Sequence, residues 1–195
     1  MLEERKKIME AALDDFSEVG LSNSSFESIA GRAGLEPAVL RALFVDKETL
    51  LRELFQEKTE PMVSAISLAV EEIHDPKALI RKSMEHLDRW LLMNPKVVKL
   101  YMQSSLEESE VQQTTFQKYM LPSEYFDRLN QFIEEGKFRC SNILILTTLL
   151  DSLIVFLHMI RSGMMMISPD LSFEQIAQQR FDAVMDLLEK GLYTY

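Results

Sequence analysis

Apolar residues recur every three or four positions along most of the chain, which is the period of a helix with one buried face. In the first segment they stand at Ile8, Ala11, Ala12, Phe16 and Val19. Gly20 follows them and provides a stop for that helix. No window alternates between apolar and polar residues for long enough to indicate a strand. The pattern therefore predicts an all-α protein of about nine helices.

Two short helices are predicted after Gly20. Ser24 or Ser25 can cap the first of them, and Gly34 permits a sharp turn behind it. Pro37 suits the first position of the second helix, because an N–H would have no helical partner there. The inward positions of the two helices are Phe26, Ile29, Ala30 and Ala33, followed by Leu40, Leu43 and Phe44.

Longer helices are predicted for the rest of the chain. Asp46 is a suitable N-cap for a helix that runs past Pro61, where we expect a kink. Turns at residues 74–76 and 94–95 bracket the next helix, and others are expected near residues 95–107 and 111–136. Ser141 can cap an apolar helix over residues 142–162. Ser172-Phe-Glu-Gln175 is a capping box that opens a final amphipathic helix.

The charge balance limits the kinds of partner. The chain has 195 residues and a formal net charge of −10, from 21 lysines and arginines against 31 aspartates and glutamates. A surface of this sign does not coat nucleic acid or an anionic membrane as a whole, so any nucleic-acid binding must be local. Cys140 is the only cysteine, and no signal peptide or clean membrane span is apparent. We therefore expect a cytoplasmic protein.

The first fifty residues resemble a known family. The run Ile8-x-x-Ala-Ala12, Phe16, Gly20-Leu21, Ser24-Ser-Phe26, Ile29-Ala30, Ala33-Gly34-Leu35, Leu40, Phe44 and Asp46-Lys-Glu48-x-Leu50 is similar to the N-terminal domain of TetR-family transcriptional regulators. The resemblance implies a helix-turn-helix DNA-binding domain over residues 1–48. It also implies a ligand-binding and dimerisation domain over residues 49–195, and a homodimeric regulator, expected to be a repressor, on palindromic operator DNA.

The surface that would meet DNA departs from the usual family pattern. Family members commonly carry a small hydroxyl residue, a basic residue, glycine and threonine at the start of the third helix, where this chain has Glu36, Pro37, Ala38 and Val39. Residues 1–50 contain six basic and ten acidic side chains. The residues expected at DNA are Ser24, Ser25, Pro37, Ala38, Val39, Arg41 and Lys47. An alternative interpretation is a TetR-fold ligand-binding or interaction protein with weakened or lost DNA binding.

The family resemblance also implies a pocket for an effector, which we expect to be an apolar or amphipathic small molecule. His86 and Trp90 stand one helical turn apart and could present a polar group and an apolar wall to one cavity. The same residues could equally be ordinary core residues at helical spacing. The full set of candidates is Met62, Ile66, His86, Trp90, Met93, Tyr101, Met102, Phe116, Tyr119 and Phe156.

The apolar helix near residue 150 is expected to need cover on two sides, and the resemblance assigns the second side to a twin subunit. The expected dimer interface is Leu149, Leu153, Phe156, Leu157, Ile160, Ile176, Phe181 and Val184. The alternative is the core of a monomer. No nucleophile with a base, paired carboxylates or metal-ligand spacing stands out, so we expect neither an enzyme nor a metal or other cofactor.

Overall fold

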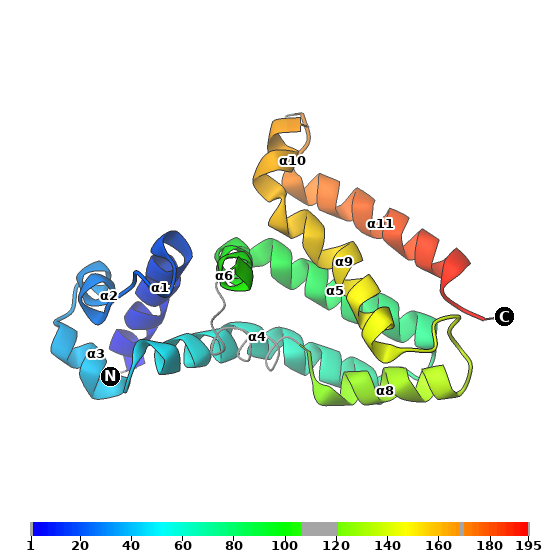
Figure 1. Ribbon diagram of the computed structural model, residues 1–195, viewed down its shortest axis with the longest axis horizontal. Coiled ribbons are helices and arrows are strands. Elements are labelled where there is room, and N and C mark those ends of the chain that lie inside the picture. The colour runs from blue at the N-terminus through cyan, green and yellow to red at the C-terminus, as the bar shows by residue number, and fades with distance from the viewer. Residues whose placement is uncertain (1, 107–120, 168–169, 195) are drawn as a thin grey trace. The chain divides into compact units, whose positions relative to one another are not determined.

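The computed structural model describes residues 2–106, 121–167 and 170–194. These residues form ten α-helices, and their pairing as strands is limited to one isolated bridge between Phe138 and Tyr193. The all-α prediction is therefore confirmed (Figure 1). The helices are α1 Leu2–Val19, α2 Phe26–Ala33, α3 Pro37–Leu43, α4 Lys47–Glu72, α5 Pro76–Met93, α6 Pro95–Leu106, α8 Ser123–Glu134, α9 Ile143–Met159, α10 Arg161–Ile167 and α11 Phe173–Gly191.

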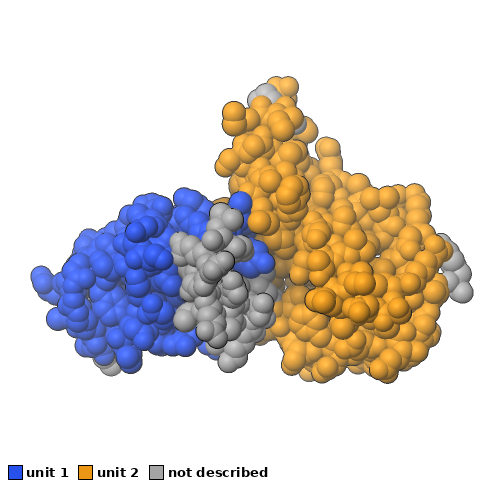
Figure 2. Space-filling view, in the orientation of Figure 1, with its two compact units in different colours: residues 1–61, 96–120 blue, residues 62–95, 121–195 orange. Residues whose placement is uncertain are grey.

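The chain folds into two compact units (Figure 2). Of the described residues, unit 1 contains 2–61 and 96–106, and unit 2 contains 62–95, 121–167 and 170–194. The division falls within α4, just after Pro61. Both units are thus built partly from α4, and a domain boundary at residue 48 stays a prediction.

Unit 1 is organised by the packing of α1 on α2 and of α2 on α3. The apolar residues expected on the inner faces supply its core: Ile8, Phe16, Ile29, Leu40 and Leu50 are each 0% exposed. Leu43, by contrast, is 37% exposed, because three residues at about 100° each place it about 60° around α3 from the buried Leu40. The end of α3 therefore presents an apolar side chain to solvent.

Unit 2 is organised around α5, which packs against both α9 and α11. Asp75 caps α5, and the predicted capping box between Ser172 and Gln175 opens α11. Phe173, Ile176, Ala177 and Leu157 form one buried cluster where α11 meets α9. One side of each helix is therefore buried within the chain, whereas α9 also leaves Leu144, Ile145, Leu149 and Phe156 exposed.

The predicted helix over residues 142–162 is two helices. Asn142, rather than Ser141, caps α9, because its side-chain oxygen accepts the N–H groups of Leu144 at 2.9 Å and Ile145 at 3.2 Å. The helical path breaks at Ile160, and α10 leaves at 64° to α9. In the described part of the chain no single helix is long and apolar enough to cross a membrane, although this bent pair would qualify together.

Candidate DNA-binding surface

Local sequence signals build the turn between α2 and α3. The Ser25 hydroxyl accepts the N–H of Ser28 at 3.1 Å, and the Ser28 hydroxyl accepts the N–H of Ser25 at the same distance, which makes a capping box at the start of α2. Gly34 ends α2 with φ of 66°, a left-handed conformation that strains residues with a Cβ. Pro37 then occupies the first turn of α3. The sequence thus encodes a short helix, a tight turn and a second short helix.

The outward side of α3 is made of methyl groups. Leu40 is fully buried, and each of Ala38 and Ala42 lies two residues away from it. Two steps of about 100° place both alanines on the opposite side of the helix, where they are exposed. Arg41 is exposed beside them, whereas Pro37 and Val39 are half-buried at the flanks. This side of α3 therefore offers two methyl groups and one guanidinium.

Arg41 is occupied by an acidic partner. Its guanidinium donates a hydrogen bond to the carboxylate of Glu27 on α2. The pKa of Glu27 lies below its ordinary value, first because the carboxylate accepts a hydrogen bond from its own backbone N–H and then because of Arg41. Glu27 therefore stays ionised, and a DNA phosphate would have to compete with it for Arg41.

Lys47, which is expected at DNA, makes hydrogen bonds within unit 1. Its ammonium donates to the carbonyl oxygens of Leu21 at 2.7 Å, Ser24 at 3.1 Å and Ser22 at 3.4 Å. These carbonyls belong to the turn between α1 and α2, in which the Leu21 oxygen also accepts the N–H of Ser24 at 3.3 Å. Lys47 therefore ties the start of α4 to that turn and is only partly exposed.

Ser24 is likewise a structural residue rather than a surface one. It is 5% exposed, and its hydroxyl donates to the carboxylate of Asp15, which is itself buried. The same carboxylate accepts hydrogen bonds from the Ser28 hydroxyl at 2.9 Å and from Arg32 Nε at 2.8 Å. Asp15 thus joins α1 to α2, a role that sequence reasoning missed because its partners stand 9 to 17 positions away.

Other cations of unit 1 also have acidic partners within the chain. Arg5 contacts Glu53 at 3.0 Å and Glu57 at 2.9 Å, Arg32 contacts Glu18 at 2.6 Å, and Lys96 pairs with Asp14. Lys6, Lys7 and Arg52 are exposed near the helix-turn-helix, and Arg52 donates a hydrogen bond to the Thr49 hydroxyl. Much of the positive charge of this unit is therefore partnered within the chain.

The expected effector residues are distributed over both units. In unit 2, Met62, Ile66 and Trp90 are buried and His86 is half-buried. Burial lowers the pKa of His86, and the nearby Lys82 and Arg89 lower it further. Of the remaining candidates, Met93 and Phe156 are exposed, Tyr101 and Met102 are half-buried in unit 1, and Phe116 and Tyr119 lie outside the described residues.

Two hydroxyls that the sequence did not single out are buried in unit 2. Ser83 on α5 is 0% exposed and Tyr125 on α8 is 1% exposed. The two hydroxyls lie close enough for Ser83 to act on the pKa of Tyr125, although neither meets the geometry of a full hydrogen bond within the described residues. Burial raises the pKa of Tyr125, so its hydroxyl stays protonated and can donate. The sequence offered little indication that these two hydroxyls are buried together, because a serine and a tyrosine on separate helices have no characteristic spacing.

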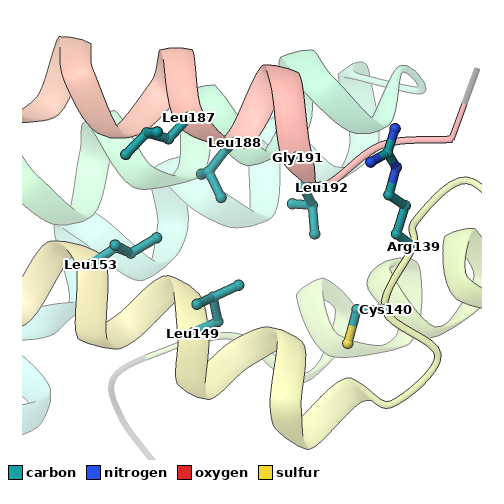
Figure 3. Close-up of a pocket in the computed structure, with 8 residues that line it drawn as sticks. All are labelled: Arg139, Cys140, Leu149, Leu153, Leu187, Leu188, Gly191 and Leu192. Atoms are coloured by element: carbon teal, nitrogen blue, oxygen red, sulfur yellow. The ribbon is translucent and has the colours of Figure 1, made fainter.

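A groove of about 400 Å³ lies between α9 and α11 (Figure 3). Leucines from both helices form its sides, and the segment before α9 adds Arg139 and Cys140 (Figure 3). Leu149, with 43% of its surface exposed, and Leu187, with 62%, leave it open to solvent. The complete lining is Arg139, Cys140, Leu149, Leu153, Leu187, Leu188, Gly191 and Leu192.

The residues expected at a dimer interface divide into two groups. Leu149 and Leu153 line this groove, Phe156 is 59% exposed, and Ile160 is half-buried. The others are already buried in the core of this chain, which accounts for their apolar character without a second subunit: Leu157, Ile176, Phe181 and Val184. The accessible part of the expected interface is therefore the outer side of α9.

Three titratable groups meet in unit 2, although nothing in their spacing suggested it. Asp88 Oδ1 lies 2.9 Å from His158 Nε2 and accepts a hydrogen bond from Arg180 Nη2 at 2.7 Å. Their side chains are 13%, 2% and 19% exposed, respectively. The cluster joins α5, α9 and α11. In the described residues no three or more histidine, cysteine, aspartate or glutamate side chains are arranged to hold a metal ion.

Comparisons with known proteins agree with this arrangement. The family model described as bacterial regulatory proteins, tetR family, matches residues 8–54. No curated protein matches the chain. The fold is similar to that of the TetR family transcriptional regulator PfmR from Thermus thermophilus, with 22% identity, 98% of each chain covered and a TM-score of 0.71.

Two further solved structures are similar over nearly their whole length. A TetR family transcription regulator from Marinobacter aquaeolei has 19% identity, with 99% of this chain and 97% of that chain covered and a TM-score of 0.69. The fatty acid degradation regulator FadR from Bacillus halodurans has 18% identity, with 93% and 94% covered and a TM-score of 0.69. At these identities the likeness establishes the shared fold.

Proposed function

We propose that the chain is a member of the tetR family of bacterial regulatory proteins, whose family model matches residues 8–54, and that it is a cytoplasmic repressor that binds operator DNA as a homodimer and responds to a small molecule. The observation that carries the proposal is the exposed side of α3, presented behind the left-handed turn at Gly34. A helix presented in this way can enter the major groove, and a two-fold dimer sets two of them about 34 Å apart, one turn of DNA.

The DNA contacts that the structure leaves available are few. Ser25 is partly exposed at the N-terminus of α2, and Pro37, Ala38 and Val39 stand at the start of α3. Arg41 joins them when it leaves Glu27. Since phosphate neutralisation supplies much of the affinity for DNA, we expect modest affinity that is measurable at low salt.

The groove between α9 and α11 supports the homodimer. Its leucines form an apolar surface, and Phe156 adds a large exposed aromatic ring on α9. Exposed apolar surface of this kind is costly in water and is commonly covered by a partner. A second copy of the chain brings the same apolar side chains to the same groove, as a two-fold interface requires.

The effector is proposed to be an apolar molecule with one polar end. Met62, Ile66 and Trp90 supply apolar side chains in unit 2, and the neighbouring buried hydroxyls of Ser83 and Tyr125 supply polar groups. Fatty acids have this chemistry, and one solved structure of the same fold is a fatty acid degradation regulator. The dimer would exist in two states that differ in the distance between its two α3 helices. The effector would release DNA by binding more tightly to the state whose spacing does not fit the operator.

The proposal is tested by measuring binding of the purified chain to DNA from upstream of its own gene, by fluorescence anisotropy at low salt. Saturable binding that excess random DNA does not displace is the expected result. The variant Ala38→Glu should abolish it, because a carboxylate then enters the groove, whereas Ala78→Glu, at an exposed alanine of α5, should not. Absence of selective binding would favour a TetR-fold interaction protein without DNA recognition.

A further inference from the structure

We propose that α3 reads the C5-methyl groups of thymines through the methyl side chains of Ala38 and Ala42, and that this apolar contact supplies much of the selectivity for the operator. The proposal rests on the proposed DNA-binding function and adds to it the chemistry of the recognised bases. It assigns the specificity to two residues that carry no hydrogen-bonding side chain.

The two methyl groups are placed to act together. Ala38 and Ala42 are four residues apart on one side of α3, so they are separated by about 6 Å along the helix axis. Both are exposed, and the buried Leu40 lies on the opposite side. Short side chains allow the helix backbone to approach the floor of the groove. Beyond the helix, Val45 is a further exposed apolar side chain, with 90% of its surface exposed.

Among the standard base pairs, only the pair of adenine with thymine offers a methyl group that such a surface can contact. In the major groove the edges of guanine, cytosine and adenine are read through hydrogen-bond donors and acceptors, whereas thymine also presents a methyl group. An alanine side chain can neither donate nor accept a hydrogen bond. It therefore favours a thymine methyl over the polar edge of another base.

The charges of unit 1 increase the share of the DNA-binding free energy that this methyl contact must supply. Arg41 is paired with Glu27, Arg32 with Asp15 and Glu18, and the Lys47 ammonium with three backbone carbonyls. These three cations are engaged within the chain, so the sequence-independent binding energy that they can supply by neutralising phosphates is small. Contacts to bases must then carry a larger share of the affinity.

The test begins with the full-length chain and a random-sequence DNA library, from which preferred sites are selected at low salt. Each thymine of the selected site is then replaced by deoxyuridine, which removes the methyl group and leaves base pairing unchanged. We expect one or two positions per half-site at which the replacement weakens binding about fourfold, the factor that corresponds to about 0.8 kcal/mol for one buried methyl. Replacement in both half-sites should weaken binding about sixteenfold.

Variants assign the effect to the two alanines. Ala38→Ser and Ala42→Ser each add a hydroxyl to the methyl carbon, which makes the tip of the side chain polar at the cost of one added oxygen. At one position of the site, each variant should bind thymine and deoxyuridine equally well. Ala78→Ser, at an exposed position of α5, should keep the preference for thymine. Thermal unfolding of each variant establishes that it is folded.

The possible outcomes separate this proposal from the one on which it rests. Selective binding that no deoxyuridine replacement weakens would overturn the thymine readout and leave the regulator function standing. Failure to select any DNA sequence would overturn the DNA-binding function and the readout together. Loss of the thymine preference in Ala38→Ser or Ala42→Ser, but not in Ala78→Ser, supports the proposal.

Discussion

Glu27 of α2 and Arg41 of α3 form an ion pair between the two helices of the helix-turn-helix. Both side chains are more than half exposed, so the pair is in contact with solvent, and the isolated interaction contributes little to stability. The ion pair matters instead for the affinity of this surface for DNA. Glu27 repels an approaching phosphate and holds the cation that would attract one.

Replacing Glu27 by glutamine should therefore strengthen DNA binding. The change removes the repulsion and releases Arg41, so the dependence of log K on log salt should steepen by about 1 for each subunit that gains a phosphate contact. Binding titrations at several salt concentrations measure both effects. Asp127→Asn makes the same charge change at an exposed site on α8 and should leave the salt dependence unaltered. An unchanged affinity in Glu27→Gln would show that Arg41 does not meet DNA.

Lys47→Met should destabilise the protein. Methionine keeps the apolar stem but leaves the carbonyls of Leu21 and Ser24 without their charged donor. A hydrogen bond to a charged group is worth about 1.5–3 kcal/mol, so a loss of that order is expected in urea unfolding. Lys6→Met, at an exposed lysine of α1, serves as the control. Equal stability of the two variants would contradict the structural role of Lys47.

Asp88→Ala should destabilise unit 2 by about 3 kcal/mol, because it leaves Arg180 and His158 without their shared acceptor in a largely buried site. Urea unfolding measures the loss. The double variant Asp88→Leu with Arg180→Met removes the unpaired charge as well and should recover part of it. A double variant less stable than Asp88→Ala would argue that the charges are not what makes the single change costly.

Leu149→Glu should weaken the proposed dimer, because it places a charge in the groove between α9 and α11. Analytical ultracentrifugation over a range of concentrations measures the shift toward monomer. Leu68→Glu changes another exposed leucine, on α4, which is 56% exposed, and should dimerise normally. If both variants associate as the original chain does, the interface lies elsewhere.

Asp151 gives the stability a dependence on pH. Part of the residue is open to solvent, yet the protein atoms around its carboxyl withdraw it from water and raise its pKa to about 6. The unfolded carboxyl loses its proton near pH 4, so between about pH 4 and 6 the folded chain binds more protons and stability falls as the pH rises. Asp151→Asn should flatten the urea-unfolding stability in this window. A slope that survives the substitution would assign it to another group.

The helices and the turn of the DNA-binding unit follow from local signals. Ser25, Gly34 and Ser172 act on backbone groups a few residues away, so their roles are readable from the sequence. The roles of Lys47 and Asp88 are not, since their partners stand 23 to 92 positions away and are brought near by packing. This is why the hydrogen bonds of Lys47 to carbonyls could not be anticipated, whereas its contact with DNA stays a prediction.

The apolar pattern of the sequence predicted which residues are buried, but not whether the same chain or a second subunit covers them. Phe181 and Val184 were expected to meet a second subunit and are buried within the chain itself. A helical stripe reports that one side is covered, whichever chain supplies the cover. Leu149 and Phe156 are distinguished only by their exposure in the folded chain.

The attachment of Lys47 to the turn between α1 and α2 has a mechanical consequence. Leu50, Leu51 and Leu54, in the following turns of α4, are also buried. The beginning of α4 is thus held by hydrogen bonds and packing together, and it cannot tilt independently of the short helices before it. A displacement applied to this end of α4 carries the helix-turn-helix with it as one rigid piece, so the flexible joint of any allosteric motion must be sought further along the helix.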